Sequence, residues 1–301
     1  MTVNSMLFIS CRENFWKDSK LSPELQWGEV GRDGATRLLT PEEIEARLDQ
    51  MKNRRILLMI HGFNDMEKPV VHHFFGVADF TQKYVVDTSG QCYFEEVIGF
   101  AWPGYSHFFD YFLAEENALA SAPLLQELLL ILSVNVKQLD VFAHSMGNRV
   151  FLEALDFPRG PGDPIIHTYF AAGPAVDEKS VYNDKAFFQS ISHIREIVVL
   201  YSLKDPIEKW FYPIAERATA LGAEGDLVPK DLPENVLMVD CTLIVHHHHA
   251  YFDQEHIYHW MRKRKAGEIQ GPDAVQDIKI SPDGEIVVIR WRKTPDQKKV
   301  S

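Results

Sequence analysis

Short apolar runs alternate with longer amphipathic stretches along this chain. The apolar runs predict strands at residues 6–11, 55–60, 97–102, 139–143, 165–171, 197–201 and 236–245. Helical patterns lie between them, at residues 69–84, 116–133, 148–155 and 252–265. Near-continuous apolar strands that alternate with helices favour an α/β fold, with a mostly parallel sheet covered by helices on both faces.

Turn signals add a hairpin at each end of the sheet. Residues 27–39 read as a turn and a strand of an antiparallel N-terminal hairpin, and residues 277–291 read as a C-terminal β-hairpin around a turn at 281–284. Between the first strands and the next apolar run, Thr40 and Glu43 form the capping box that starts a helix.

No linker rich in Pro, Gly or Ser divides the chain. We therefore expect one α/β domain over residues 1–265 and a C-terminal β-hairpin tail over 266–301. The long mixed stretch at 206–235 has room for a small cap or lid. The tail can extend the sheet or pair with another subunit, which would make a homo-oligomer.

Composition narrows the function classes. The chain carries 31 Lys and Arg against 43 Asp and Glu, a net charge of −12, which argues against a nucleic-acid partner. Three scattered cysteines without a CxxC pair argue against a disulfide framework and suit a reducing cytosol. The longest apolar stretch, 128–134, is far shorter than the roughly 20 residues that span a bilayer. We expect a cytoplasmic protein without a membrane span.

The sharpest chemical signal is Ala143-His144-Ser145-Met146-Gly147, between a predicted strand and a predicted helix. Small residues two before and two after a serine permit the tight turn of a nucleophile elbow. The elbow would lift the Ser145 hydroxyl above the sheet edge and place the Met146 N–H at a helix N-terminus, where it can bind an oxyanion. The simpler alternative is that Ser145 only caps the helix.

A second turn follows an earlier predicted strand, at Ile60-His61-Gly62-Phe63-Asn64. The N–H of Phe63 is placed to be the other donor of an oxyanion hole. The alternative is an ordinary glycine turn in which His61 belongs to the core.

These motifs, together with Phe100-Ala101-Trp102-Pro103 and the continuation through Arg149, resemble the α/β-hydrolase superfamily, within it the esterase/lipase-like group DUF900. The resemblance covers roughly residues 55–260. It implies an α/β-hydrolase fold and a catalytic triad in the chain order Ser, acid, His.

The resemblance places the acid of the triad after the strand at 197–201, where Asp205 lies. Asp177, after the preceding strand, is the rival. The base falls in the run of histidines at 246–249. We favour His249, because His-Ala-Tyr-Phe resembles the end of the related sequences. His247 is the runner-up, because it shares a face with His249 in an extended chain.

The segment after the strand at 97–102 is aromatic, and we predict that Trp102, Tyr105 and His144 contact the substrate. Core packing is the alternative for the aromatic segment that follows Gly104 and begins at Tyr105. The run of four histidines also permits a metal hypothesis, with His256 and His259 as further ligands, but four adjacent imidazoles bind metal adventitiously. We therefore expect no functional metal.

The sequence thus predicts a serine hydrolase that cleaves a small-molecule carboxylic ester through Ser145, His249 and Asp205, by way of an acyl-enzyme and without a cofactor. The alternative is a non-catalytic α/β-hydrolase scaffold that binds a partner or small ligand.

Overall fold

The computed structural model describes residues 3–104, 110–155, 166–177, 180, 186–207, 212, 220–221, 233–269 and 275–292. Within these residues, eleven strands form one sheet in the order β11-β10-β9-β8-β7-β6-β4-β5-β1-β2-β3. The strands are β1 (Ser5–Glu13), β2 (Lys17–Gly31), β3 (Thr36–Leu38), β4 (Arg55–Ile60), β5 (Glu96–Ala101), β6 (Gln138–His144), β7 (Ile166–Ala172), β8 (Ile194–Tyr201), β9 (Val236–Asp240), β10 (Val275–Ile280) and β11 (Ile286–Arg292).

The sheet is parallel through its middle, from β1 and β5 across to β9 and β10. It is antiparallel at its two ends, where β1, β2 and β3 pair in sequence and β10 pairs with β11. The predicted fold class is therefore confirmed.

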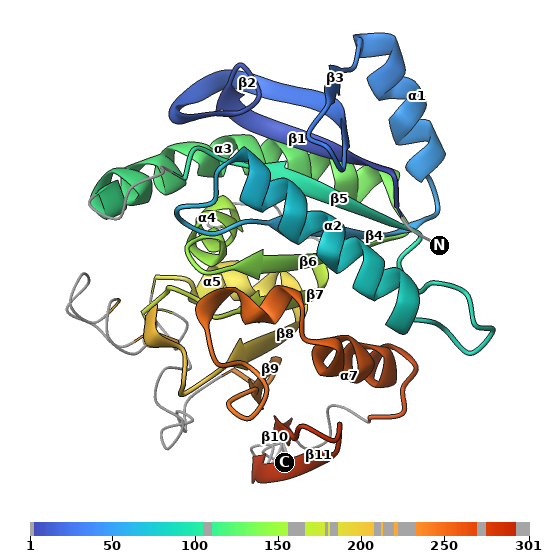
Figure 1. Ribbon diagram of the computed structural model, residues 1–301, viewed down its shortest axis with the longest axis vertical. Coiled ribbons are helices and arrows are strands. Elements are labelled where there is room, and N and C mark those ends of the chain that lie inside the picture. Colours follow the sequence, from blue (N-terminus) through green and yellow to red (C-terminus); the bar gives the residue numbers. More distant parts are fainter. Residues whose placement is uncertain are drawn as a thin grey trace, which may run out of the picture.

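Helices cover both faces of the sheet (Figure 1). The helices are α1 (Pro41–Met51), α2 (Glu67–Tyr84), α3 (Tyr111–Asn135), α4 (Gly147–Leu155), α5 (Phe188–Ser192) and α7 (Glu255–Lys265), with a 3-10 helix η4 (His248–Phe252). The buried side chains of α2, η4 and α7 form one core cluster with one face of the sheet, and those of α1, α3, α4 and α5 form another with the opposite face. Continuous apolar strands are thus buried on both sides.

The predicted start of α1 is confirmed. The Thr40 hydroxyl accepts a hydrogen bond from the Glu43 N–H, and the Glu43 carboxylate accepts one from the Thr40 N–H. Both N–H groups would otherwise lack a partner within the helix.

Two strands differ from the pattern-based prediction. β2 begins at Lys17, because pairing with β1 carries residues 17–26, which have no strong apolar alternation of their own. β9 ends at Asp240, because the chain turns at Cys241, whose carbonyl accepts hydrogen bonds from the N–H groups of Ile244 and Val245.

The order of the central strands places two loops side by side. β5 and β6 flank β4 on opposite sides. The connection after β4 runs toward β5 and the connection after β6 runs toward β7, so the two connections leave in opposite directions between β4 and β6. The parallel register pairs Ile60 with Ala143. The turn after β4 and the turn after β6 therefore leave the same edge of the sheet next to each other, at the switch point where ligands bind in open α/β sheets.

The C-terminal hairpin extends the sheet, because β10 pairs in parallel with β9 through Ile278 and Val239. This leaves β11 at the outer edge, and its pairing with another subunit stays a prediction. The stretch 206–235 lies mostly outside the described residues, so the cap also stays a prediction.

Helix α3 is long and apolar enough to cross a membrane by length and composition alone, and it is the single described helix that passes this test. The sequence pattern predicts none, because the longest apolar stretch, 128–134, is short and is interrupted by Ser133. A core helix passes the same test, and α3 packs Leu125, Leu128 and Leu132 into the core beside the sheet. The test therefore does not assign α3 to a membrane.

Candidate active site

Ser145 lies in a strained turn between β6 and α4. Its φ of 52° is in the left-handed region, which a residue with a side chain seldom adopts without support from its surroundings. Hydrogen bonds fix the turn, since the Ser145 N–H donates to the carbonyl of Ala172 and the Ser145 carbonyl accepts from the N–H groups of Asn148 and Ala175. This geometry is that of a nucleophile elbow.

Two glycines allow the neighbouring turns to approach each other. A Cβ on Gly147 would lie 2.3 Å from the carbonyl oxygen of His61, and one on Gly62 would lie 2.8 Å from the Cβ of Ser145. Both distances are shorter than a contact between atoms that are not bonded to each other. The small residue that the motif requires at position 147 is therefore explained by contact with the turn after β4.

We expect Gly147→Ala to lower the free energy of unfolding by about 1–3 kcal/mol, because the added methyl group meets backbone rather than a movable side chain. Gly76→Ala is the matched control. Gly76 lies inside α2 with nothing within 4 Å of an added Cβ, so the control gains about 0.5–1 kcal/mol of helix stability. Urea unfolding of the two variants checks this, and equal stability would contradict the contact.

Asn148 and Tyr169 hold the elbow through buried hydrogen bonds. Asn148 is fully buried; its Nδ2 donates to the Ser145 carbonyl at 2.8 Å, and its Oδ1 accepts from the Tyr169 hydroxyl at 2.7 Å. The sequence analysis gave neither side chain a role. A buried polar residue directly after the elbow was the available signal.

A buried acid and imidazole pair lies beside the elbow. The Nδ1 of His248 donates to the Oδ2 of Asp205 at 2.7 Å, and Asp205 is fully buried while His248 is 9% exposed. The other carboxylate oxygen of Asp205 accepts from the Ile207 N–H. The Nε2 of His248 is buried and has no hydrogen-bond partner among the described residues. A base oriented by a carboxylate with its second nitrogen available is the arrangement that activates a serine.

The histidine in this pair differs from the expected one. The resemblance favours His249, and His247 is the runner-up because it shares a face with His249 in an extended chain. His248 instead opens the 3-10 helix η4, so the two-residue period ends there. His247 and His249 are exposed, and the bond to Asp205 expected of His249 is made by His248.

Asp177, the rival acid, lies elsewhere in the loop after β7. It forms an isolated antiparallel bridge with Ala220, and its carbonyl accepts from the Ser180 hydroxyl and N–H. Asp205, the favoured acid, makes the bond to His248, whereas the prediction paired it with His249.

His144, which precedes the proposed nucleophile, is hydrogen-bonded to the segment that carries His248. Its Nε2–H donates to the carbonyl oxygen of His248 at 2.8 Å, and the two imidazole rings lie 4.5 Å apart. Burial, and then the neighbouring histidines, lower the pKa of His144 well below its ordinary value, so the ring is neutral at neutral pH. Because His144 is fully buried, its role here is to hold the backbone of His248 rather than to line a surface.

The turn after β4 is held by a buried arginine that the sequence analysis did not consider. Arg12 in β1 donates to the carbonyls of Trp102 and Asp65 at 2.7 and 2.8 Å, and to the Nε2 of His61 at 2.8 Å. His61 in turn donates from Nδ1 to the Gly62 carbonyl at 2.7 Å. A lone cation in an apolar strand was the signal that could have found Arg12.

The two expected oxyanion donors lie in these adjoining turns. The N–H groups of Met146 and Phe63 have no hydrogen-bond acceptor among the residues that the structure describes. Met146 directly precedes α4, so its N–H also benefits from the positive end of the helix dipole.

Of the three predicted substrate contacts, Trp102 is fully buried and stacks on His61, with ring centroids 5.4 Å apart and an interplanar angle of 7°. Its indole N–H donates to the His61 carbonyl. Trp102 therefore packs in the core. Tyr105 lies outside the described residues.

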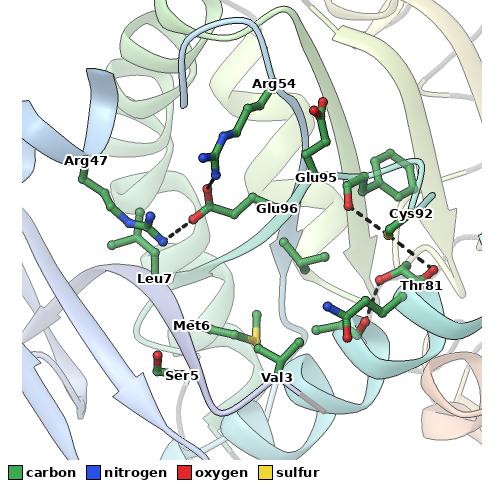
Figure 2. Close-up of a pocket in the computed structure, with 14 residues that line it drawn as sticks. Val3, Ser5, Met6, Leu7, Arg47, Arg54, Thr81, Cys92, Glu95 and Glu96 are labelled. Carbon is green, nitrogen blue, oxygen red and sulfur yellow. Dashed lines mark hydrogen bonds and ion pairs between the residues drawn. The ribbon is translucent and has the colours of Figure 1, made fainter. Parts of the chain in front are cut away.

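A cavity of about 220 Å³ lies at the other edge of the sheet, near the first residues of β1, β4 and β5. Figure 2 shows Arg47 and Arg54 both directed at the Glu96 carboxylate. Their guanidinium nitrogens lie 2.6 and 3.5 Å from its oxygens. Since the arginines are already paired with Glu96 and the elbow leaves the opposite edge, this cavity is not part of the candidate active site.

Several solved esterases resemble the chain in fold at low identity. An esterase from Pyrobaculum calidifontis is 12% identical with a TM-score of 0.41, and the match covers 89% of this chain and 85% of that one. The Pyrococcus furiosus esterase Pf2001 is 12% identical with a TM-score of 0.40, covering 89% and 88%. EstE1, a thermostable carboxylesterase from a metagenomic library, is 10% identical with a TM-score of 0.42, covering 90% and 91%.

No curated protein matches the chain. A family model described as an alpha/beta hydrolase of unknown function, DUF900, matches residues 38–234, which is more than half of the chain and includes β4, the elbow and Asp205. With the strand order and the elbow already in place, this match decides the family: the chain belongs to the DUF900 alpha/beta hydrolases.

Proposed function

We propose that this protein is a serine hydrolase that cleaves carboxylic esters of small molecules, with Ser145 as nucleophile, His248 as base and Asp205 as the acid that orients His248. The observation that carries the proposal is the buried pair of His248 and Asp205 beside a strained serine turn. The Nε2 of His248 has no hydrogen-bond partner within the part of the chain that the structure describes, and it is available to take a proton from the serine.

The proposed reaction has two stages. Ser145 Oγ attacks the carbonyl carbon of the ester while its proton passes to the Nε2 of His248. The N–H groups of Met146 and Phe63 donate to the oxygen that gains negative charge. The bond to the alcohol oxygen then breaks, and that oxygen takes the proton from His248. A water molecule then attacks the acyl carbon while its proton passes to the Nε2 of His248. The bond between the acyl carbon and Ser145 Oγ breaks, Oγ takes the proton back from His248, and the carboxylic acid leaves.

The Asp205 carboxylate accepts a hydrogen bond from the Nδ1 of His248, which leaves the lone pair of Nε2 toward the serine. His144 holds the peptide of His248, and Arg12 with His61 holds the peptide after Gly62. These side chains act on the reaction through position, since each is itself fully buried.

A fluorophosphonate probe tests this proposal, because it reacts with a serine made nucleophilic by its surroundings. We expect a single adduct on the wild-type protein by intact mass, located at Ser145 by peptide mapping, and none on Ser145→Ala. Ser89→Ala, which changes an exposed serine in the turn before β5, keeps the adduct. A folded wild-type protein that takes no adduct and turns over no ester in a panel of graded acyl length would favour the non-catalytic scaffold.

A further inference from the structure

Three potential metal ligands from separate parts of the chain meet beside the candidate active site. Asp65 lies in the turn before α2, His73 lies within α2, and His249 lies in η4. One carboxylate oxygen and one ring nitrogen from each histidine all lie within 4.8 Å of one another. Only one of the three belongs to the run of four histidines, so the cluster differs from the adventitious site that the run alone suggests.

We propose that Asp65, His73 and His249 bind a divalent first-row transition ion such as Zn²⁺. Two imidazoles and one carboxylate on one side of an ion are a recurrent set for such metals, and the remaining positions are left for water. The proposal does not rest on serine hydrolysis, and it departs from the expectation of no functional metal.

The distances fit an ion after small side-chain movements. Three atoms no more than 4.8 Å apart have a common point within about 2.8 Å of each, and Zn²⁺ bonds to imidazole nitrogen at about 2.0–2.1 Å and to carboxylate oxygen at about 2.0–2.2 Å. Rotations that draw each ligand atom inward by less than about 1 Å are therefore sufficient.

The electronic state of the ligands also fits. The Nδ1 of His73 lies 3.7 Å from the Oδ1 of Asp65, too far for a hydrogen bond, and it is buried without a hydrogen-bond partner in the described part of the chain. Partial burial of the rings, and then the adjacent histidines, lower the pKa values of His73 and His249 to about 4, so both rings are neutral at neutral pH. Neutral imidazoles are the form that coordinates metal.

The cluster has a supported side and an open side. The Oδ2 of Asp65 accepts from the Gly62 N–H at 3.3 Å, and the Asp65 carbonyl accepts from Arg12. His73 stacks on Phe252, with ring centroids 4.6 Å apart. His249 is exposed and provides a route for the ion from solvent. A bound ion would tie the turn after β4 to η4, which carries His248.

The test uses the full-length protein, stripped with EDTA and dialysed, and titrated calorimetrically with Zn²⁺ alone. Co²⁺ replaces Zn²⁺ for a visible absorption spectrum that reports nitrogen and oxygen ligation. We expect one ion per chain. His73→Gln and His249→Gln should each weaken binding by more than the roughly 10–100-fold that follows loss of an outer-shell partner.

His72→Gln, which changes the exposed neighbour of His73 on α2, and His246→Gln and His247→Gln in the histidine run are the matched controls, and they keep the affinity. His73→Phe retains a ring that can stack on Phe252 and separates loss of a ligand from loss of packing. Saturating Zn²⁺ should raise the Tm of the wild-type protein and leave that of His73→Phe unchanged.

Two results would overturn the proposal. Binding that survives His73→Gln and is lost in His246→Gln or His247→Gln would show adventitious capture by the histidine run. No binding by a folded wild-type protein would show that the three side chains only pack together. Neither result bears on fluorophosphonate labelling of Ser145, so the two proposals fail separately.

Discussion

Replacing His248 with alanine is expected to lower kcat/KM for an ester substrate by on the order of 10⁴-fold or more, because the serine then has no group to take its proton. The structure singles out His248 among four consecutive histidines, since its Nδ1 donates to Asp205 at 2.7 Å and its Nε2 is unpartnered within the described residues. Initial rates with an activated ester, in the presence of EDTA, provide the measurement.

The neighbouring histidines are the controls for this result. His247→Ala changes an exposed side chain at the start of η4 and should leave the rate nearly unchanged. His249→Ala removes the residue that the sequence pattern favours, and we expect the rate to fall by no more than about tenfold. A rate lost in His249→Ala but kept in His248→Ala would contradict the assignment from the structure and restore the one from sequence.

The strands and the elbow could be predicted because their signals are local. β4 has the bounds that its unbroken apolar run gives, Arg55–Ile60. The small residues around Ser145 predict a tight turn without knowledge of what it touches. The His61 carbonyl leaves no room for a side chain at position 147, and His61 is far from Gly147 in the sequence. The requirement for glycine can nevertheless be recognised from the five-residue motif around Ser145.

The base could not be selected from sequence, because the choice among adjacent histidines depends on where an extended segment becomes helical. In an extended segment, side chains at odd and even positions point to opposite faces. This alternation ends at His248, where the 3-10 helix η4 begins. The chain order that the family resemblance implies favours Asp205, in the loop after β8, over its rival Asp177, in the loop after β7. The bond to His248 then distinguishes the two acids.

The supporting roles of Arg12 and Trp102 could not be predicted for a different reason. Arg12 stands near the end of an apolar strand, and Trp102 follows another, and a sequence pattern does not tell which face or end of the sheet each will meet. The structure brings both against His61, where Arg12 donates to the ring and Trp102 stacks on it. Such roles depend on contacts between segments far apart in the chain.

Lys265→Met is expected to lower the free energy of unfolding by about 3–5 kcal/mol, because it leaves a buried carboxylate without its cation. The Nζ of Lys265 lies 2.6 Å from the Oδ2 of Asp140, and the two side chains are 4% and 0% exposed. The ammonium group also donates to the Thr168 hydroxyl. Urea unfolding followed by circular dichroism measures the loss.

Lys263→Met, on the same helix, is the matched control and should change stability by less than about 0.5 kcal/mol. Adding Asp140→Asn to Lys265→Met should restore part of the loss, because the amide removes the buried charge. A loss below about 1 kcal/mol in Lys265→Met would mean that Asp140 does not depend on this cation.

The pH dependence of this loss has a defined sign. Burial raises the pKa of Asp140, but Lys265 and then His167 lower it, and the result is below the ordinary value of 3.8. A lowered pKa in the folded state stabilises the protein above pH 3.8, and this contribution is lost as the pH falls through the folded-state pKa. Without Lys265 the pKa rises, so the difference between wild type and variant should be largest near neutral pH and narrow in acid.

This ion pair bears on the site as well as on stability. Asp140 lies in β6, the strand that ends at the Ser145 turn, and Lys265 lies at the end of α7, which follows the η4 segment that carries His248. The pair therefore joins the strand of the proposed nucleophile to the helix after the proposed base. A partly destabilised Lys265→Met that remains folded should lose kcat more than its affinity for an ester, because the two catalytic groups would be less firmly placed relative to each other.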